Sequence, residues 1–425
     1  MKIKHIMFLS YGGGHVNMLV PIIKYFSRCS IYKITVIGLT TACTRLKSDG
    51  ITFYSFKDYV SLFPQHEVLR YGRRLADEGN QSADVPYSES VSYLGINYLE
   101  LVETFGQKVA SRMYRMNGRQ IFYPFHSMKK ILECINPDLL VATNSPRSEK
   151  AAINAAASLS IPSICLVDLF GFQEGKWISK PNFATKVCVL SDFVRDRFID
   201  LGRSPDDLVV TGNPVFDKLS NFKDSLGFTN SKINLQSSFK KSLTILWASQ
   251  SEPASHPFHP QKVGDSFLPR KVDEELFKIA RNHPDFLIYI RLHPSENVEY
   301  VANQLPENVR VSSKNSDLHE LISKVDLVIT MTSTVAVEAA LIGKPIVTVD
   351  MSIFTEDAPY SEMGLSRGVS SLKDLERAIL EAVSMPVPKE EIERIVGKPG
   401  TATKNIISVI EDLLRPLHEK SLLTH

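Results

Sequence analysis

The chain has 425 residues, of which 43% are hydrophobic and 23% are charged, and its formal net charge is +2. A chain of this length can form two hydrophobic cores of roughly 200 residues each. The nearly balanced charge argues against a nucleic-acid partner. The five cysteines lie far apart without a CxxC pair, which favours reduced thiols over disulfides or a metal site. The N-terminus reaches glycines before a secretory segment can form, so we expect a soluble cytoplasmic protein.

Short β-branched segments alternate with helical patterns along the whole chain. The predicted strands are 4–10, 33–39, 51–56, 138–143, 163–168, 186–190 and 207–212 in the first half, and 243–249, 286–293, 308–313, 326–331 and 345–350 in the second. Such alternation is typical of parallel sheets with helices on both faces. The pattern therefore predicts an α/β protein of two facing Rossmann-like domains with an interdomain cleft.

A polar stretch separates the two halves. Residues 220–242 are rich in Ser, Asn and Lys and have no regular period, as expected for a linker. We predict an N-terminal Rossmann-like domain at 1–219 and a C-terminal Rossmann-like domain at 220–402. The last segment, 403–425, is predicted as a helix that can cross back to the first domain.

A glycine-rich turn, Gly12–Gly13–Gly14–His15, follows the first predicted strand. Glycines let a ligand approach the main-chain N–H groups at the start of the next helix. The spacing is not GxGxxG, because Asn17 stands where the third glycine belongs, and a dinucleotide site is therefore disfavoured. A neutral His15 can take a proton from an acceptor hydroxyl. The alternative is a plain glycine turn whose histidine caps a helix or meets solvent.

Three hydroxyl residues, Thr332, Ser333 and Thr334, stand between the predicted strand 326–331 and the helix after it. Hydroxyls and free N–H groups at a helix start can hold a phosphate without a metal ion. Glu338 lies about one turn inside that helix and can accept hydrogen bonds from a ribose. Plain N-capping, with Glu338 solvated, is the alternative, but it explains one hydroxyl better than three.

Other polar residues lie at the carboxyl ends of predicted strands, where open α/β sheets bind their ligands. His293 and Pro294 end one strand and can contact a phosphate or the base, although such a pair is usually structural. Ser249 and Gln250 can meet the phosphates. The remaining candidates face the acceptor side of the first domain: Asn144, Ser145, Arg147 and Asp168.

The segment 108–130 mixes Lys and Arg with Tyr and Phe. It can contact an anionic acceptor or the inner face of a membrane as a peripheral segment. A solvated helix with buried aromatic residues is the more common structure for such a pattern.

Several motifs together resemble glycosyltransferases of the two-Rossmann (GT-B) class. They are GGGH after the first strand, VVTGNPVFDKL at 209–219, RLHP at 291–294 and DLVITMTSTVAVEAALIGKPIVTVD at 326–350. The glycine-rich start resembles the UDP-N-acetylglucosamine transferase of peptidoglycan synthesis (MurG-like), and the HP and Ser/Thr motifs resemble bacterial capsule, sialic-acid and Kdo transferases. The resemblance implies that His293, Ser333 and Thr334 bind the donor phosphate and that no metal or other cofactor is needed.

The expected function is transfer of a sugar from a UDP- or CMP-sugar to a glycan or lipid-linked acceptor in surface polysaccharide or glycoconjugate synthesis. No E-x7-E pair follows the Ser/Thr helix, which favours inversion. We expect His15 to act as the base, with Asp168 as the next candidate.

Two alternatives stay open. A nucleotide-sugar 2-epimerase shares this fold, but it is expected to carry HR-x-EN and SGG motifs, whereas this chain has Ser333–Thr334–Val335 in place of SGG and no HR-x-EN. A non-catalytic partner subunit that binds a nucleotide or lipid ligand is the alternative of another class.

Overall fold

The computed structural model describes residues 3–79, 84–220, 242–256, 259, 261–300, 305–313 and 316–415. The chain divides into two compact units, each described here by itself. Unit 1 comprises Met1–Asp217 and Thr401–His425, and unit 2 comprises Lys218–Gly400. The linker predicted at 220–242 lies almost entirely outside the described residues. No helix within the described ranges combines the length and apolar character needed to cross a membrane.

Unit 1 is built on a six-stranded parallel sheet. Its strands are β1 (Lys4–Ser10), β2 (Tyr32–Gly38), β3 (Leu139–Thr143), β4 (Ser163–Leu166), β5 (Lys186–Val189) and β6 (Leu208–Val210). Their order in the sheet is β2-β1-β3-β4-β5-β6. Successive strands are added on opposite sides of β1, so the topological switch point, where ligands bind in open α/β sheets, lies between β1 and β3.

The prediction of a strand at 51–56 is wrong. This segment makes a single parallel bridge, from Tyr54 to Ile37 of β2, and then enters the 3-10 helix η1 (Phe56–Leu62). The cause is local, because Ser55 and Asp58 form a capping box that starts η1 and ends the extended backbone.

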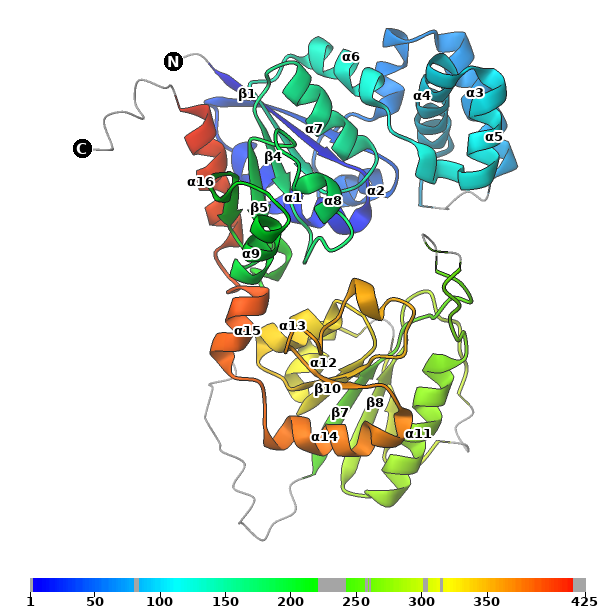
Figure 1. Cartoon of the computed structure of the whole chain (residues 1–425), viewed down its shortest axis with the longest axis vertical. Helices are drawn as coiled ribbons and strands as arrows, with labels where there is room; N and C mark the ends of the chain where they lie inside the picture. The colour runs from blue at the N-terminus through cyan, green and yellow to red at the C-terminus, as the bar shows by residue number, and fades with distance from the viewer. Residues whose placement is uncertain are drawn as a thin grey trace, which may run out of the picture. The chain divides into compact units, whose positions relative to one another are not determined.

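Helices cover the unit 1 sheet and form a separate cluster beside it (Figure 1). The covering helices are α1 (Gly13–Phe26), α2 (Thr41–Ser48), α6 (Phe125–Ile135), α7 (Ser148–Ser158), α8 (Gly175–Ile178), α9 (Asp192–Asp200) and α16 (Ala402–Leu414). The cluster is inserted between β2 and β3 and consists of α3 (Gln65–Glu78), α4 (Tyr87–Phe105) and α5 (Gln107–Asn117). Gly72 and Gly95 let α3 and α4 approach closely, since a Cβ on either glycine would lie 2.0 or 2.1 Å from a carbonyl oxygen of the other helix.

The C-terminal helix α16 belongs to unit 1, although it follows the whole of unit 2 in the sequence. Ile406, Ile410 and Leu414 of α16 are buried in the same core as Phe8 of β1 and Phe26 of α1. Asp217 fixes the start of the helix, because its carboxylate accepts hydrogen bonds from the N–H groups of Ala402 (2.9 Å) and Thr403 (2.8 Å).

Unit 2 repeats the architecture of unit 1. Its parallel sheet has the order β12-β11-β10-β7-β8-β9, with strands β7 (Leu243–Ala248), β8 (Phe286–Arg291), β9 (Val309–Val311), β10 (Leu327–Thr330), β11 (Ile346–Val349) and β12 (Arg367–Val369). The short strand β12 was not predicted. Strand β7 pairs with both β8 and β10, so the switch point lies between β7 and β10.

The helices of unit 2 are α11 (Leu268–Asn282), α12 (Leu318–Lys324), α13 (Val335–Ile342), α14 (Leu375–Ser384) and α15 (Lys389–Val396). One core joins β7, β8, β10 and β11 to α11 and α14. Helix α13 ends at Gly343, which adopts the left-handed conformation (φ +87°) that favours glycine at a helix C-terminus.

Candidate functional site

At the switch point of unit 2, the side chain of Gln250 joins the two strand ends. Gln250 lies two residues after β7, and Thr332 lies two residues after β10. The Thr332 N–H donates to Gln250 Oε1 at 3.0 Å, and Gln250 Nε2 donates to Thr332 Oγ1 at 2.8 Å. These two bonds fix the backbone from which α13 begins.

The hydroxyl residues predicted before α13 have different surroundings. Ser333 Oγ accepts a hydrogen bond from the N–H of Val335 at 3.3 Å and thus caps the helix start. Thr334 is exposed, and its side chain makes no capping bond. The start of α13 therefore presents an exposed hydroxyl next to main-chain N–H groups at the positive end of the helix dipole, which suits a phosphate.

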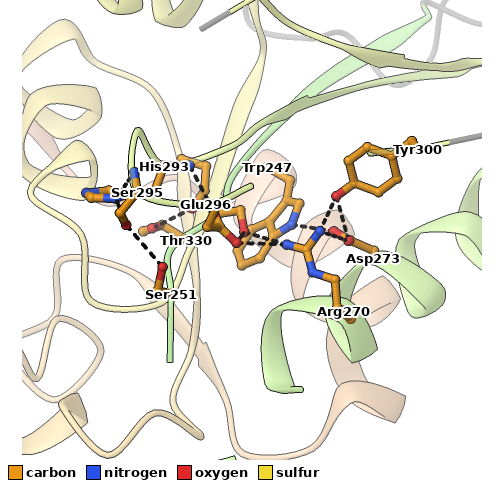
Figure 2. A network of polar contacts seen from close by, with 11 residues as sticks. Trp247, Ser251, Arg270, Asp273, His293, Ser295, Glu296, Tyr300 and Thr330 are labelled. Atoms are coloured by element: carbon orange, nitrogen blue, oxygen red, sulfur yellow. Dashed lines mark hydrogen bonds and ion pairs between the residues drawn. The ribbon is translucent and has the colours of Figure 1, made fainter. Parts of the chain in front are cut away.

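The loop after β8 brings His293 close to the loop after β7 (Figure 2). His293 is exposed, and its Nδ1 lies 2.6 Å from Ser295 Oγ, which in turn lies 3.1 Å from Ser251 Oγ. Pro294 is exposed as well. His293 thus presents its imidazole to solvent from a fixed turn, as a phosphate contact requires.

A buried ionic network that the sequence did not reveal supports this loop (Figure 2). Arg270 of α11 forms ion pairs with Asp273 (2.8 Å) and Glu296 (3.0 Å), whose side chains are 4% and 7% exposed. Glu296 Oε2 also accepts the N–H of His293 at 2.8 Å, and its Oε1 accepts the hydroxyl of Ser249 at 3.0 Å. Ser249, predicted as a phosphate contact, is therefore a buried member of the network that holds the His293 loop, and its hydroxyl is not exposed to a ligand.

Asp273 completes the network from the other side. It accepts hydrogen bonds from the indole N–H of Trp247 (2.8 Å) and the hydroxyl of Tyr300 (2.7 Å). Burial raises the pKa of Asp273, while the Arg270 guanidinium opposes this shift. The sequence contained one sign of this network. Glu296 stands three residues after His293, and at this spacing a side chain can accept a hydrogen bond from the backbone of its own turn.

Glu338 lies on α13 and is paired within unit 2. Its Oε2 accepts a hydrogen bond from Nε2 of His319 on α12, and both side chains are largely buried. The alternative of a solvated Glu338 is therefore excluded. A contact from Glu338 to a ribose stays a prediction.

In unit 1, the glycine-rich loop is held by a buried carboxylate. Glu149, on the first turn of α7, is fully buried and accepts the N–H of Tyr11 at 2.6 Å. Burial raises the pKa of Glu149, and the positive charge of a protonated His15 opposes this shift. His15 Nδ1 and Glu149 Oε2 are both buried and have no hydrogen-bond partner among the described residues. The structure thus places two titratable side chains beside the start of α1, at the switch point of the sheet.

The glycines themselves form the helix start. Gly12 is the N-terminal cap, and α1 begins at Gly13. A Cβ on Gly14 would meet nothing within 4 Å, so the loop leaves open space at this position.

The second predicted base, Asp168, has different neighbours. Asn213 Nδ2 donates to Asp168 Oδ1 at 3.2 Å, and the Asp168 N–H donates to Asn144 Oδ1 at 3.0 Å. Three strand ends, those of β4, β6 and β3, are joined in this way. Ser145 is buried, and the Arg147 guanidinium lies over the Tyr11 ring, 4.5 Å from its centroid.

A second buried carboxylate, Glu89 on α4, was not predicted. Its Oε1 accepts the N–H of Thr40 at 3.3 Å, while Oε2 has no hydrogen-bond partner among the described residues. Burial raises the pKa of Glu89 to about 7. Thr40 has a positive φ of 51°, which is rare for a β-branched residue, and its hydroxyl donates to the carbonyl of Tyr11 at 2.6 Å. Glu149 therefore contacts the Tyr11 backbone directly, whereas Glu89 is linked to it through Thr40.

Comparison with known proteins defines the class. The chain is similar to the UDP-GlcNAc 2-epimerase from Neisseria meningitidis bound to UDP-GlcNAc, with a TM-score of 0.56 and 15% identity over 96% of this chain and 100% of that one. The Methanocaldococcus jannaschii UDP-GlcNAc 2-epimerase in complex with UDP-GlcNAc and UDP gives 0.56 and 13%, over 96% and 99%. The calicheamicin glycosyltransferase CalG4 gives 0.57 and 15%, over 97% and 99%. The predicted GT-B fold, with two Rossmann-like α/β units, is thus confirmed, whereas the resemblance to a MurG-like glycosyltransferase is not supported.

The family follows from the sequence. The family model described as UDP-N-acetylglucosamine 2-epimerase matches residues 179–410, and the chain belongs to this family. No curated protein sequence matches the chain.

The prediction of glycosyltransferase activity is therefore wrong. The prediction of a glycan or lipid-linked acceptor depended on that activity and is no longer supported. The family match favours the 2-epimerase that the sequence analysis kept as an alternative. The reason for the error is physical. Glycine loops and hydroxyl-rich helix starts bind diphosphates in any enzyme of this fold, and similar structures include both epimerases and glycosyltransferases.

Proposed function

We propose that this protein is a nucleotide-sugar 2-epimerase that inverts the configuration at C2 of a UDP-linked N-acetylhexosamine. The observation that carries the proposal is the family match over 179–410, which includes all of unit 2, Lys218–Gly400. The Neisseria and Methanocaldococcus epimerases with similar folds hold UDP-GlcNAc. A nucleotide-sugar is therefore the substrate class to test.

We assign the diphosphate to the start of α13. There Ser333, Thr334 and the adjacent main-chain N–H groups offer hydrogen bonds to phosphate oxygens, and His293 adds an exposed imidazole. Gln250 fixes the position of Thr332 and so fixes the geometry of the helix start. These groups need no divalent ion to compensate the phosphate charge. Glu338 is our candidate for the ribose.

We assign the proton transfers to unit 1. Inversion at C2 requires that a proton leave one face of the carbon and return to the other, so acid–base groups are needed. His15 Nδ1 and Glu149 Oε2 are buried and have no hydrogen-bond partner in the part of the chain that the structure describes, and Asp168 supplies a carboxylate at the same edge of the sheet. Burial raises the pKa of Glu149, because the charged form of the carboxyl loses its hydration.

This chain differs from the motifs expected of such an enzyme. It carries Ser333–Thr334–Val335 in place of SGG and has no HR-x-EN. The hydroxyls of Ser333 and Thr334 add hydrogen-bond donors that glycines lack, which fits phosphate binding. Gln250 is an uncharged amide, so the strand end after β7 contributes no positive charge there.

The test is proton NMR of UDP-N-acetylglucosamine incubated with the protein in D2O. We expect deuterium at C2 together with the appearance of the C2 epimer. Binding of UDP without deuterium incorporation would contradict catalysis and favour a non-catalytic nucleotide-binding subunit. Absence of UDP binding in calorimetry would reject the assignment of the α13 site itself.

A peripheral membrane contact through 108–130 stays part of the proposal. Helix α5 exposes Val109 and Met116 alongside Lys108, Arg112 and Arg115, a mixture that suits anionic lipid. The test is sedimentation with vesicles in which about a third of the lipid is phosphatidylserine. We expect the protein to co-sediment with these vesicles at low salt. Failure to sediment would reject the contact.

A further inference from the structure

A cavity in unit 1 lies apart from the residues assigned above. It has a volume of about 380 Å³ and is formed by the start of α7, the short helix α8, the turn at 180–183 and Tyr123, which precedes α6. A volume of this size lies within the range of small-molecule sites, roughly 300–1,000 Å³. None of the residues that line it belongs to the groups assigned to proton transfer or to nucleotide binding.

Positive charge collects at this cavity. Lys150 and Lys180 line it, and Lys176 lies next to them on α8. None of the three ammonium groups forms an ion pair among the described residues. Burial lowers the pKa of Lys150, and repulsion by Lys180 and Lys176 lowers it further. An anion bound here would relieve this repulsion.

Aromatic rings form the walls and hold one ammonium in place. The Lys150 ammonium lies 4.6 Å from the centroid of the Trp177 ring and 5.5 Å from that of Tyr123, which are cation–π distances. Phe183 adds a third aromatic side chain to the lining. Flat apolar surfaces of this kind pack against the C–H faces of sugar rings.

Hydrogen-bonding groups accompany the rings. Asn154 lines the cavity and donates to the Tyr123 hydroxyl at 2.6 Å. The Trp177 side chain is buried, and its Nε1 has no acceptor among the described residues. A buried N–H without an acceptor is costly, and a ligand hydroxyl or anionic oxygen can satisfy it.

We propose that this cavity is a second ligand site for an acidic sugar, whose phosphate or carboxylate binds Lys150 and Lys180 and whose ring packs against Tyr123 and Trp177. A monosaccharide that carries a phosphate or a carboxylate satisfies the lysines, the aromatic walls and the polar groups together. The proposal does not depend on the epimerase activity, because it involves a different set of residues.

The test is titration of the protein with glucose 6-phosphate while tryptophan fluorescence is recorded. The chain has two tryptophans, and Trp247 is fully buried in unit 2, so a saturable change is expected to come from Trp177. The Trp177→Phe variant should abolish the signal, with folding checked by circular dichroism. Glucuronate is titrated in parallel to distinguish a carboxylate from a phosphate, and binding of either acid supports the proposal.

Matched variants test whether Lys150 and Lys180 bind the anion. Lys150→Gln and Lys180→Gln should each weaken binding about tenfold, whereas Lys47→Gln, which removes an exposed charge on α2 elsewhere in unit 1, should leave it unchanged. Glucose and inorganic phosphate should each bind at least about tenfold more weakly than glucose 6-phosphate. The proposal is overturned if neither acid gives a saturable change, if inorganic phosphate binds as tightly as glucose 6-phosphate, or if Lys47→Gln weakens binding as much as Lys150→Gln.

Discussion

The side chain of Gln250 exchanges two hydrogen bonds with Thr332, at 3.0 and 2.8 Å, and so ties the end of β7 to the end of β10. Unit 1 has a counterpart, where Glu149, which follows β3, binds the N–H of Tyr11, which follows β1. In both units the bond crosses the switch point of the sheet. A parallel sheet leaves a crevice there, and a side chain that bridges it sets the geometry of the helix start that faces a ligand.

We expect Gln250→Leu to weaken UDP binding about tenfold. Leucine has a similar size but leaves the Thr332 N–H without its acceptor, which costs about 1–3 kcal/mol, and the start of α13 loses its fixed position. Isothermal titration calorimetry with UDP measures the effect. Gln65→Leu, at an exposed position of α3, is the control. Unchanged affinity in Gln250→Leu would show that the α13 start does not hold the nucleotide.

Arg270→Met should destabilise the protein by about 3–5 kcal/mol, because it leaves the buried carboxylates of Asp273 and Glu296 without their cation. Urea unfolding followed by fluorescence measures the loss, since Trp247 donates to Asp273. Arg377→Met removes exposed ion pairs on α14 and should cost at most about 1 kcal/mol. Equal effects of the two substitutions would disprove the importance of the buried network.

Glu89 should make stability depend on pH. Its pKa is raised from 4.5 to about 7 by burial, so between these values the folded chain binds more protons than the unfolded chain. The free energy of unfolding therefore falls as pH rises through this window, by about 3 kcal/mol in total at about 1.4 kcal/mol per pH unit.

The Glu89→Gln variant should lose this slope and be more stable than the native protein at pH 8, since Gln still accepts the Thr40 N–H. Urea unfolding at a series of pH values from 4.5 to 8 tests this. Glu78→Gln, at an exposed position of α3, should leave the slope intact. A native slope retained in Glu89→Gln would assign the pH dependence to another group.

His15→Ala and Asp168→Asn should each reduce deuterium incorporation at C2 of UDP-N-acetylglucosamine by about 10²–10⁴-fold if both residues transfer protons. UDP affinity should stay within about twofold, since neither residue belongs to unit 2. The rates come from NMR in D2O and the affinities from calorimetry. Full activity of one variant would remove that residue from the mechanism and leave Glu149 as its replacement.

The sequence predicted much of the fold because the strands of both sheets are buried on two faces and therefore appear as continuous apolar runs. It failed at 51–56, where only Tyr54 bridges to β2 and the capping box of Ser55 and Asp58 starts a 3-10 helix at Phe56. It also failed at β12, whose residues Arg367 and Gly368 are exposed and give no hydrophobic signal. The activity was predicted wrongly, because diphosphate-binding loops are shared by enzymes with different reactions on this fold.

By itself, the sequence determined the alternation of strands and helices and the presence of polar residues at the strand ends, since both depend on local pattern. Only the tertiary structure decided which of those residues meet. Gln250 and Thr332 are 82 positions apart, and Tyr11 and Glu149 are 138 positions apart, so their contact depends on the order of strands in the sheet. Burial is equally non-local, because Glu89 and Glu149 lie on helices and acquire their raised pKa values from the segments that fold over them.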